Sequence, residues 1–290
     1  DSIAILNLTI NSCPGCTDPN ANNYNPYATL EDSTCLYSPF VFGCTDSTAL
    51  NYDPLATIDD SSCCYNTGQL LSQIGQDIDG EAAGDLSGRS VSLSSDGNIV
   101  AIGASNANFG FGHIRIYENI SGTWFQIGQN LNGDTIVGQA WVVSLSNDGN
   151  TVAIGAPFNI GFFGNVRIFK NIGGYWFQIG QDIPGETAGD QSGTSISLSS
   201  DGSIVAIGAP YNYSDTNSYI TGNGHVRIFE NISGSWTQIG QDIDGEITSS
   251  SGRSGTSVSL SSDGSIVAIG APRNTSDTSG GSFSQGHVRI

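Results

Sequence analysis

Methionine is absent from this chain of 290 residues, Lys170 is its only lysine, and charged residues make up only 12% of it. Its solubility therefore depends on Ser, Thr, Asn and Asp rather than on mixed charge. The few charges are mostly acidic, with 27 Asp and Glu against 8 Lys and Arg and a net charge of −19. This charge repels phosphate backbones and anionic lipids, so it argues against nucleic-acid partners and favours cations.

Long hydrophobic runs are also missing. No apolar stretch approaches the roughly 20 residues that span a bilayer, so we predict no membrane insertion. No basic segment precedes a hydrophobic one at the start, and we expect any secretion signal to have been removed already. The length allows one large domain or two small ones.

Cysteine is confined to the first 64 residues, where a segment repeats after 28 residues. "GCTDPNANNYNPYATLEDSTCLY" from Gly15 aligns without a gap with "GCTDSTALNYDPLATIDDSSCCY" from Gly43, and 14 of 23 positions are identical. We predict a disulfide-rich double repeat over residues 13–66, typical of an oxidising, extracellular compartment. The cysteines at matching positions are Cys16 and Cys35 in one copy and Cys44 and Cys63 in the other, with Cys13 and Cys64 left over. Pairing within each copy is the simplest connectivity, although sequence alone does not choose among the alternatives.

Acidic residues crowd the same loops. Carboxylate and Asn oxygens are the ligands that Ca²⁺ prefers, so calcium is one hypothesis for this region. Asp and Asn also cap turns through the neighbouring backbone, which is the alternative. The metal hypothesis names Asp18, Asp32, Asp46 and Asp60. The pattern GCTD, NYxPxA and a terminal SC resembles a short Cys/Asp repeat of large secreted and surface proteins, and this resemblance implies location more than chemistry.

A second repeat begins near Gly68 and occurs four times. Its most regular part is "SLSSDGSIVAIGAP" from Ser259, and "SLSxDG" recurs after 52, 53 and 62 residues. The unit starts with a Trp segment such as "WFQIGQ", continues through "SVSLS" and "IVAIGA", and ends with "HVRIF". Alternating segments predict strands with one buried face, and the continuously apolar "IVAIGA" predicts a strand covered on both faces. Asp-Gly between the middle two segments predicts a type I′ hairpin turn.

Four short strands per repeat predict an all-β fold built as a β-propeller-like array over residues 67–290. "SGRSVSLSSDGNIVAIGAS" leading to "GHIRIY" resembles the FG-GAP repeat of integrin-α-like propellers. That resemblance implies an extracellular protein used for adhesion or ligand binding. The calcium loop of FG-GAP repeats is shortened here to Ser-Ser-Asp-Gly, which has too few oxygens to enclose Ca²⁺. Sequence does not decide whether four blades close a ring.

Catalytic motifs are absent from the sequence, so we predict that the protein is not an enzyme. His113, His225 and His287 share one repeat position, which indicates an architectural role. The recurring Trp124, Trp176 and Trp236 are interpreted as blade core rather than as a sugar platform. N-glycosylation sequons stand at Asn7, Asn119, Asn212, Asn231 and Asn274. Asn119 and Asn231 share an "ENISG" turn that we expect to be exposed.

Residues 1–12, including "SIAILNLTI", form a predicted β-strand arm with no repeat partner of its own. Such a strand needs a sheet edge. One alternative is that it docks on its own chain. The other is that it adds to the sheet of a neighbouring subunit and links chains into a filament. The subunit contacts would then be Ile3, Ile5, Leu6, Leu8 and Ile10.

Two functions fit these features. The repeats, disulfides and low charge favour a non-catalytic, self-associating structural subunit of an extracellular filament or surface layer. The alternative is an integrin-like module whose variable loops bind a glycan or a surface protein. A cluster of Tyr211, Tyr213 and Tyr219 in one variable loop would favour the second function.

Overall fold

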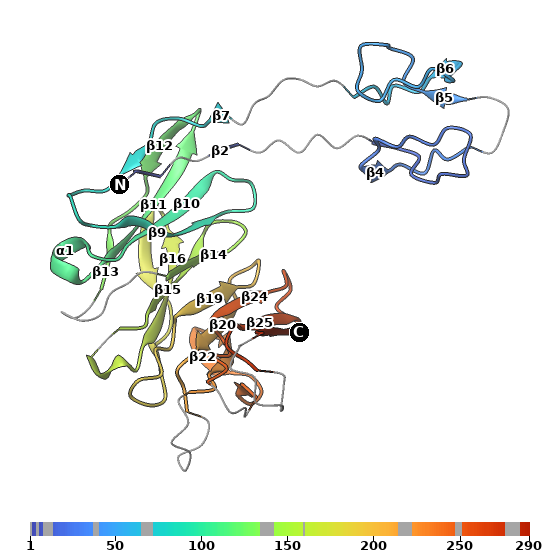
Figure 1. The fold of residues 1–290 in the computed structure, drawn as a ribbon. Helices are drawn as coiled ribbons and strands as arrows, with labels where there is room; N and C mark the ends of the chain where they lie inside the picture. The colour runs from blue at the N-terminus through green and yellow to red at the C-terminus, as the bar shows by residue number, and fades with distance from the viewer. Residues whose placement is uncertain are drawn as a thin grey trace. The chain divides into compact units, whose positions relative to one another are not determined.

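The computed structural model describes residues 2–3, 6–7, 14–36, 41–64, 72–133, 142–158, 160–213, 222–246, 251–275 and 285–290. The chain divides into two compact units, one of Asp1–Ala4 with Gly75–Ile290 and the other of Ile5–Ile74 (Figure 1). The predicted all-β, propeller-like fold is confirmed. In the described residues, helix is limited to two single turns, α1 (Ala107–Gly110) and η1 (Ile160–Phe162).

Four successive antiparallel sheets build the larger unit. The first contains β9 (Ser87–Leu93), β10 (Ile99–Ala104), β11 (His113–Ile120), β12 (Thr123–Gln126) and β13 (Leu131–Asn132). The second contains β14 (Val142–Leu145), β15 (Thr151–Ala156), β16 (Asn165–Ile172), β17 (Tyr175–Gln178) and β18 (Ile183–Pro184). The third contains β19 (Ser195–Leu198), β20 (Ile204–Ala209), β21 (His225–Ile232), β22 (Ser235–Gln238) and β23 (Ile243–Asp244). The fourth contains β24 (Ser257–Leu260), β25 (Val267–Ala271) and β26 (His287–Arg289).

The repeat read from the sequence starts at the Trp segment, but in the structure each sheet starts at the "SVSLS" strand that follows this segment. The Trp segment closes each complete sheet instead of opening the next one, as β12 does beside β11. The reason is the "ENISG" turn, in which Gly122 N–H donates to Asn119 Oδ1 at 2.8 Å. A tight turn of this kind joins antiparallel neighbours, so the two flanking strands must share a sheet.

The Asp-Gly hairpin exists, but the predicted type I′ turn is wrong. Gly97 has a φ of +72°, whereas no positive φ occurs at Asp96 or its three described equivalents. Gly97 N–H donates to Ser94 O at 3.0 Å, so Ser95 and Asp96 are the central residues of the turn. A type I turn followed by a left-handed Gly suits this longer loop. The Asp96 carboxylate stabilises it by accepting from Ser94 Oγ at 2.6 Å and from Asn98 N–H at 3.0 Å.

Apolar cores lie between consecutive sheets. Between the first two, Ile114 and Ile116 pack with Val143 and Leu145, and all four are buried. The equivalent residues form the next two interfaces. The "IGA" glycine permits this approach, because a Cβ on Gly155 would lie 2.2 Å from the carbonyl oxygen of Gly193. The predicted double-sided burial of "IVAIGA" is confirmed in β15 and β20.

The N-terminal arm has a repeat equivalent that the sequence did not reveal. β1 (Ser2–Ile3) pairs with β8 (Ile78–Asp79), and β2 (Leu6–Asn7) pairs with β7 (Ser72–Gln73). The register matches that of β11, in which His113 and Ile114 pair with β13 while Tyr117 and Glu118 pair with β12. Ser2–Ile3 and Leu6–Asn7 thus each pair in the register that the third strand has in the other sheets.

These pairings place the arm on its own chain, the first of the two alternatives considered for it. Ile3 and Leu6 lie in the paired strands, while Ile5, Leu8 and Ile10 lie outside the described residues. In sequence, the cysteine module stands where the other blades have their "ENISG" turn.

Candidate binding cleft in the cysteine module

Each cysteine repeat is a small loop closed by one disulfide. The structure pairs Cys16 with Cys35 and Cys44 with Cys63, each at a sequence separation of 19. Cys64 is also disulfide-bonded, and Cys13 lies outside the described residues. A pair of two-residue parallel strands supports each loop: β3 (Pro14–Gly15) with β4 (Leu30–Glu31), and β5 (Phe42–Gly43) with β6 (Ile58–Asp59).

A buried Asn ties each loop to its own end. Asn23 is 5% exposed, donates to Thr34 O at 2.8 Å and accepts from Leu36 N–H at 2.7 Å. Asn51, at the matching position, donates to Ser62 O at 2.7 Å and accepts from Cys64 N–H at 2.6 Å. The Asn of "NY" is therefore structural, because its amide replaces missing backbone pairing in a loop with little sheet.

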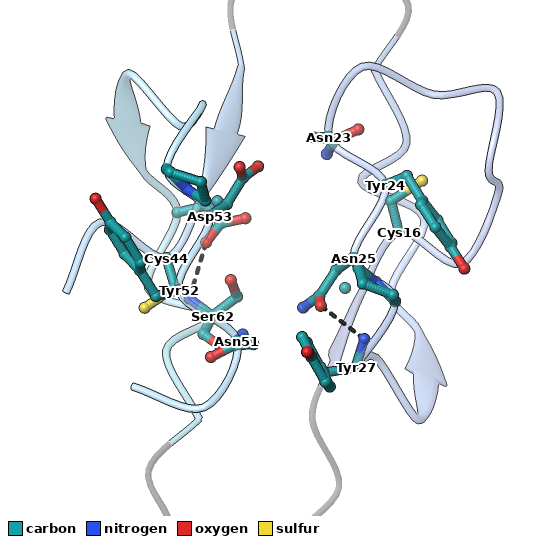
Figure 2. A pocket seen from close by; sticks show the side chains of 15 residues that line it. Cys16, Asn23, Tyr24, Asn25, Tyr27, Cys44, Asn51, Tyr52, Asp53 and Ser62 are labelled. Carbon is teal, nitrogen blue, oxygen red and sulfur yellow. Dashed lines mark hydrogen bonds between the residues drawn. The ribbon is translucent and has the colours of Figure 1, made fainter. Parts of the chain in front are cut away.

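Equivalent residues of the two repeats line a cleft of about 190 Å³ (Figure 2). Tyr24 and Tyr27 lie on one side, with Tyr52 and Asp53 on the other. These tyrosines are 40%, 61% and 42% exposed, so their rings are accessible. Asn25 Oδ1 accepts from Tyr27 N–H at 2.9 Å, which fixes the turn that carries the most exposed ring.

The cleft offers aromatic faces beside amide and carboxylate groups. Ligand pockets usually enclose about 300–1,000 Å³, so this cleft suits one sugar ring or one side chain rather than a whole cofactor. A flat apolar ring beside hydrogen-bonding groups is the arrangement that stacks sugars. The sequence contained these tyrosines, but nothing in it showed that the two repeats bring them to one cleft.

The predicted calcium ligands form turns. Oδ1 of each carboxylate accepts from the backbone N–H two residues on: Asp18 from Asn20, Asp32 from Thr34, Asp46 from Thr48 and Asp60 from Ser62. This is the turn-capping alternative. Within the described residues, these four do not gather into a group at metal-ligand distances; the two such groups are Cys16, Glu31 and Cys35, and Glu186, His225 and Asp242. The cysteines of the first group are oxidised and are not available as thiolate ligands.

The sequon residues differ in burial. Asn212 and Asn274 are 4% and 1% exposed, and a glycan on either conflicts with the folded geometry. Asn119 and Asn231 are half-buried, and each accepts the N–H of the Gly three residues on. Nothing is described for the Asn7 side chain. Asn119 and Asn231 are thus more accessible than Asn212 and Asn274.

The recurrent residues of the propeller serve the fold. Trp124, Trp176 and Trp236 are at most 4% exposed, which confirms the core interpretation. Arg115, Arg167 and Arg227 are buried and donate to the carbonyls of Asp79, Asn132 and Pro184. Of the tyrosine cluster expected in a variable loop, Tyr213 is exposed, Tyr211 lies 4.5 Å from the Arg253 guanidinium, and Tyr219 lies outside the described residues.

Comparisons with known proteins assign no family. No protein-family model matches the chain, and no curated protein matches its sequence. Two structural neighbours are candidate 6-phosphogluconolactonases, from Bacteroides fragilis (TM-score 0.39, 19% identity, 54% of this chain and 38% of that one) and Bacteroides uniformis (0.43, 15%, 63% and 47%). A third is Kuenenia stuttgartiensis hydrazine synthase (0.44, 14%, 63% and 49%).

This chain therefore spans less than half the length of each of these neighbours. Such similarity is too low to transfer an activity, and the FG-GAP resemblance stays a prediction. No helix in the described part of the chain is long and apolar enough to cross a membrane.

Proposed function

We propose that the protein is a non-catalytic, extracellular structural subunit that associates with further copies of itself through the faces of its sheets. The disulfides support an oxidising compartment. The recurrent Trp and Arg residues are used in the fold, which leaves the sheet faces and the cysteine module as interaction surfaces.

The observation that carries the proposal is the exposure of apolar residues on the first and fourth sheets. Val91 and Leu93 of β9 are 51% and 48% exposed, whereas their equivalents in β14, Val143 and Leu145, are 6% and 7% exposed. Val288 of β26 is 67% exposed, although its equivalent Ile114 is fully buried. Val91, Leu93 and Val288 thus expose residue types that are buried where sheets meet inside the array.

Complementarity follows from the repeat. Inside the array, the face with Ile114 packs against the face with Val143 and Leu145 of the next sheet. A second copy that brings its Val91 and Leu93 face to the Val288 face would reproduce that interface. Such a contact is heterologous and makes rings or filaments, depending on its rotation.

Sedimentation velocity over a concentration series tests this. Wild-type chain should self-associate, and Leu93→Asp should shift the equilibrium toward monomer because a charge would be buried in the contact. Ile120→Asp is the matched control, since Ile120 is 53% exposed on an outer hairpin. A wild-type chain that stays monomeric throughout would refute the proposal, as would equal effects of the two substitutions.

One observation favours a binding module as a second candidate. Tyr27 lies at the cysteine-module cleft and is 61% exposed, whereas the rings of Tyr24 and Tyr52 point away from the space between the two repeats (Figure 2). A glycan array probed with wild-type chain and with Tyr27→Ala measures this function. Signals that Tyr27→Ala abolishes would support it, and an empty array, or signals unchanged by the substitution, would count against a sugar-binding cleft.

A further inference from the structure

Two carboxylates and an imidazole meet at the junction of the second and third sheets. Glu186 follows β18 of the second sheet, while His225 begins β21 and Asp242 precedes β23 of the third. His225 Nδ1 lies 3.6 Å from Asp242 Oδ2 and 3.8 Å from Glu186 Oε2. One ligand atom from each residue lies within 4.8 Å of the others.

The imidazole is almost fully buried, and one of its two nitrogens lacks a hydrogen-bond partner in the described part of the chain. The His225 side chain is 1% exposed, and its Nε2 has no partner among the described residues. The carboxylate oxygens nearest to Nδ1 lie beyond hydrogen-bond distance. Burial lowers the pKa of His225. Burial, and secondarily the nearby acids, raise the pKa of Glu186 despite Arg227.

The equivalent site of the first sheet contains an amide donor where this one has a second acid. In the first sheet, Asn130 takes the place of Asp242, and its Nδ2 lies 3.3 Å from each carboxylate oxygen of Glu81 beside His113.

In the second sheet the acid is kept at this position, as Asp182, and the amide stands at the position of the histidine instead. Asn165 replaces the histidine, and its Nδ2 lies 3.3 Å from Asp182 Oδ2. In the third sheet, Arg227 is the cationic neighbour of Glu186 within the described residues. Its Nη1 lies 3.8 Å from Glu186 Oε1. The oxygen that faces His225 and Asp242 therefore has no such donor within the described residues.

We propose that Glu186, His225 and Asp242 bind one Zn²⁺ ion. Ligand atoms about 2.0–2.2 Å from a tetrahedral Zn²⁺ lie roughly 3.4 Å from one another, close to the spacing around His225 Nδ1. The two carboxylates balance the charge of the ion, and mixed imidazole and carboxylate donors favour Zn²⁺ over Ca²⁺. Because Glu186 follows a strand of the second sheet, the ion joins two sheets. This proposal does not depend on self-association.

Calorimetric titration of ZnCl₂ into the chelator-treated, dialysed full chain tests the site. We expect one ion per chain, and at least about a tenfold loss of affinity in Asp242→Asn, since even indirect supports of a metal site are worth about 10–100-fold. Asn at this repeat position is native in the first sheet, so the variant should fold. Glu81→Gln changes an acid beside His113 and is the matched control, with unchanged binding.

Asn130→Asp gives the reciprocal test, because it builds the same three donors around His113. We expect this variant to bind a second Zn²⁺. The proposal fails if the wild type binds no stoichiometric Zn²⁺, if Asp242→Asn binds as tightly as the wild type, if Asn130→Asp gains no ion, or if CaCl₂ binds at the site in preference to ZnCl₂.

Discussion

The two units of this chain achieve stability in different ways. In the propeller unit, large side chains such as Ile114 and Ile168 are fully buried between sheets. In the described part of the cysteine module, the buried hydrophobic residues are only Cys16, Ala21, Cys44 and Ala49. Tyr27 and Leu55 of the module are 61% and 72% exposed. A core this small needs covalent closure, whereas repeated sheets supply burial themselves.

Reduction of the disulfides should produce the largest difference in stability between the two units. Each loop closed by a disulfide at a separation of 19 residues contributes about 3 kcal/mol to module stability. With dithiothreitol, we expect amide exchange protection to vanish from residues 14–64 and to persist in β10, β15 and β20. Simultaneous loss of protection in both units would show that the propeller depends on the module.

The converse change is Ile168→Ala, which opens a cavity between the second and third sheets. Loss of a buried Ile side chain costs about 2–5 kcal/mol, so the thermal midpoint of the propeller should fall while the module transition stays in place. Ile172→Ala on the same strand is the control, because Ile172 is 58% exposed. Equal shifts from the two variants would contradict the assigned core.

A smaller loss is expected for Trp176→Phe. Trp176 is 2% exposed, and its Nε1 donates to Ile127 O at 3.1 Å across the first interface. Phe keeps most of the packing but leaves that carbonyl without its donor, at a cost of about 1–3 kcal/mol. Denaturant unfolding measures the change. Phe177→Leu, at a neighbouring residue that is 53% exposed, should be nearly neutral.

The smallest expected effect is a loss of propeller stability at low pH. Hydrogen bonds from the Ser two residues earlier, and then from the residue two positions later, lower the pKa of Asp96 and Asp263 to about 2 from 3.8. These bonds favour the folded state above pH 4, and their contribution is lost as the pH falls from about 4 to about 2. Asp96→Asn should flatten this part of the propeller's stability profile. A profile unchanged by the substitution would show that the turn carboxylate is not coupled to folding.

The features that recur in every copy could be predicted from the sequence, because each copy repeats the same alternation of apolar residues. The sheets, the hairpin and the Trp core could all be inferred in this way. The turn type could not, since Ser-Asp-Gly is compatible with more than one loop length. Nor could the identity of the arm, because "SIAILN" shares with "HIRIYE" a strand pattern too short to align without the pairing register.

The third-sheet cluster was missed for a different reason. Its histidine recurs, which indicated architecture, and its members lie 39 and 17 residues apart in sequence. By sequence, the acids of "DIDGE", Asp242 among them, were possible metal ligands, but "NLNGD" at Asn130 lacks two of these acids, which favoured a turn role. That exchange of Asn130 for Asp242 places an amide in one site and a carboxylate in another. The proposed metal site thus depends on a difference between copies rather than on the residues they share.

Self-association through sheet faces is the central claim, and negative-stain imaging of the concentrated, purified chain tests it most directly. We predict strings or closed rings of repeated units in the wild type, and single particles with Leu93→Asp. Single particles from the wild type under the same conditions would contradict the claim.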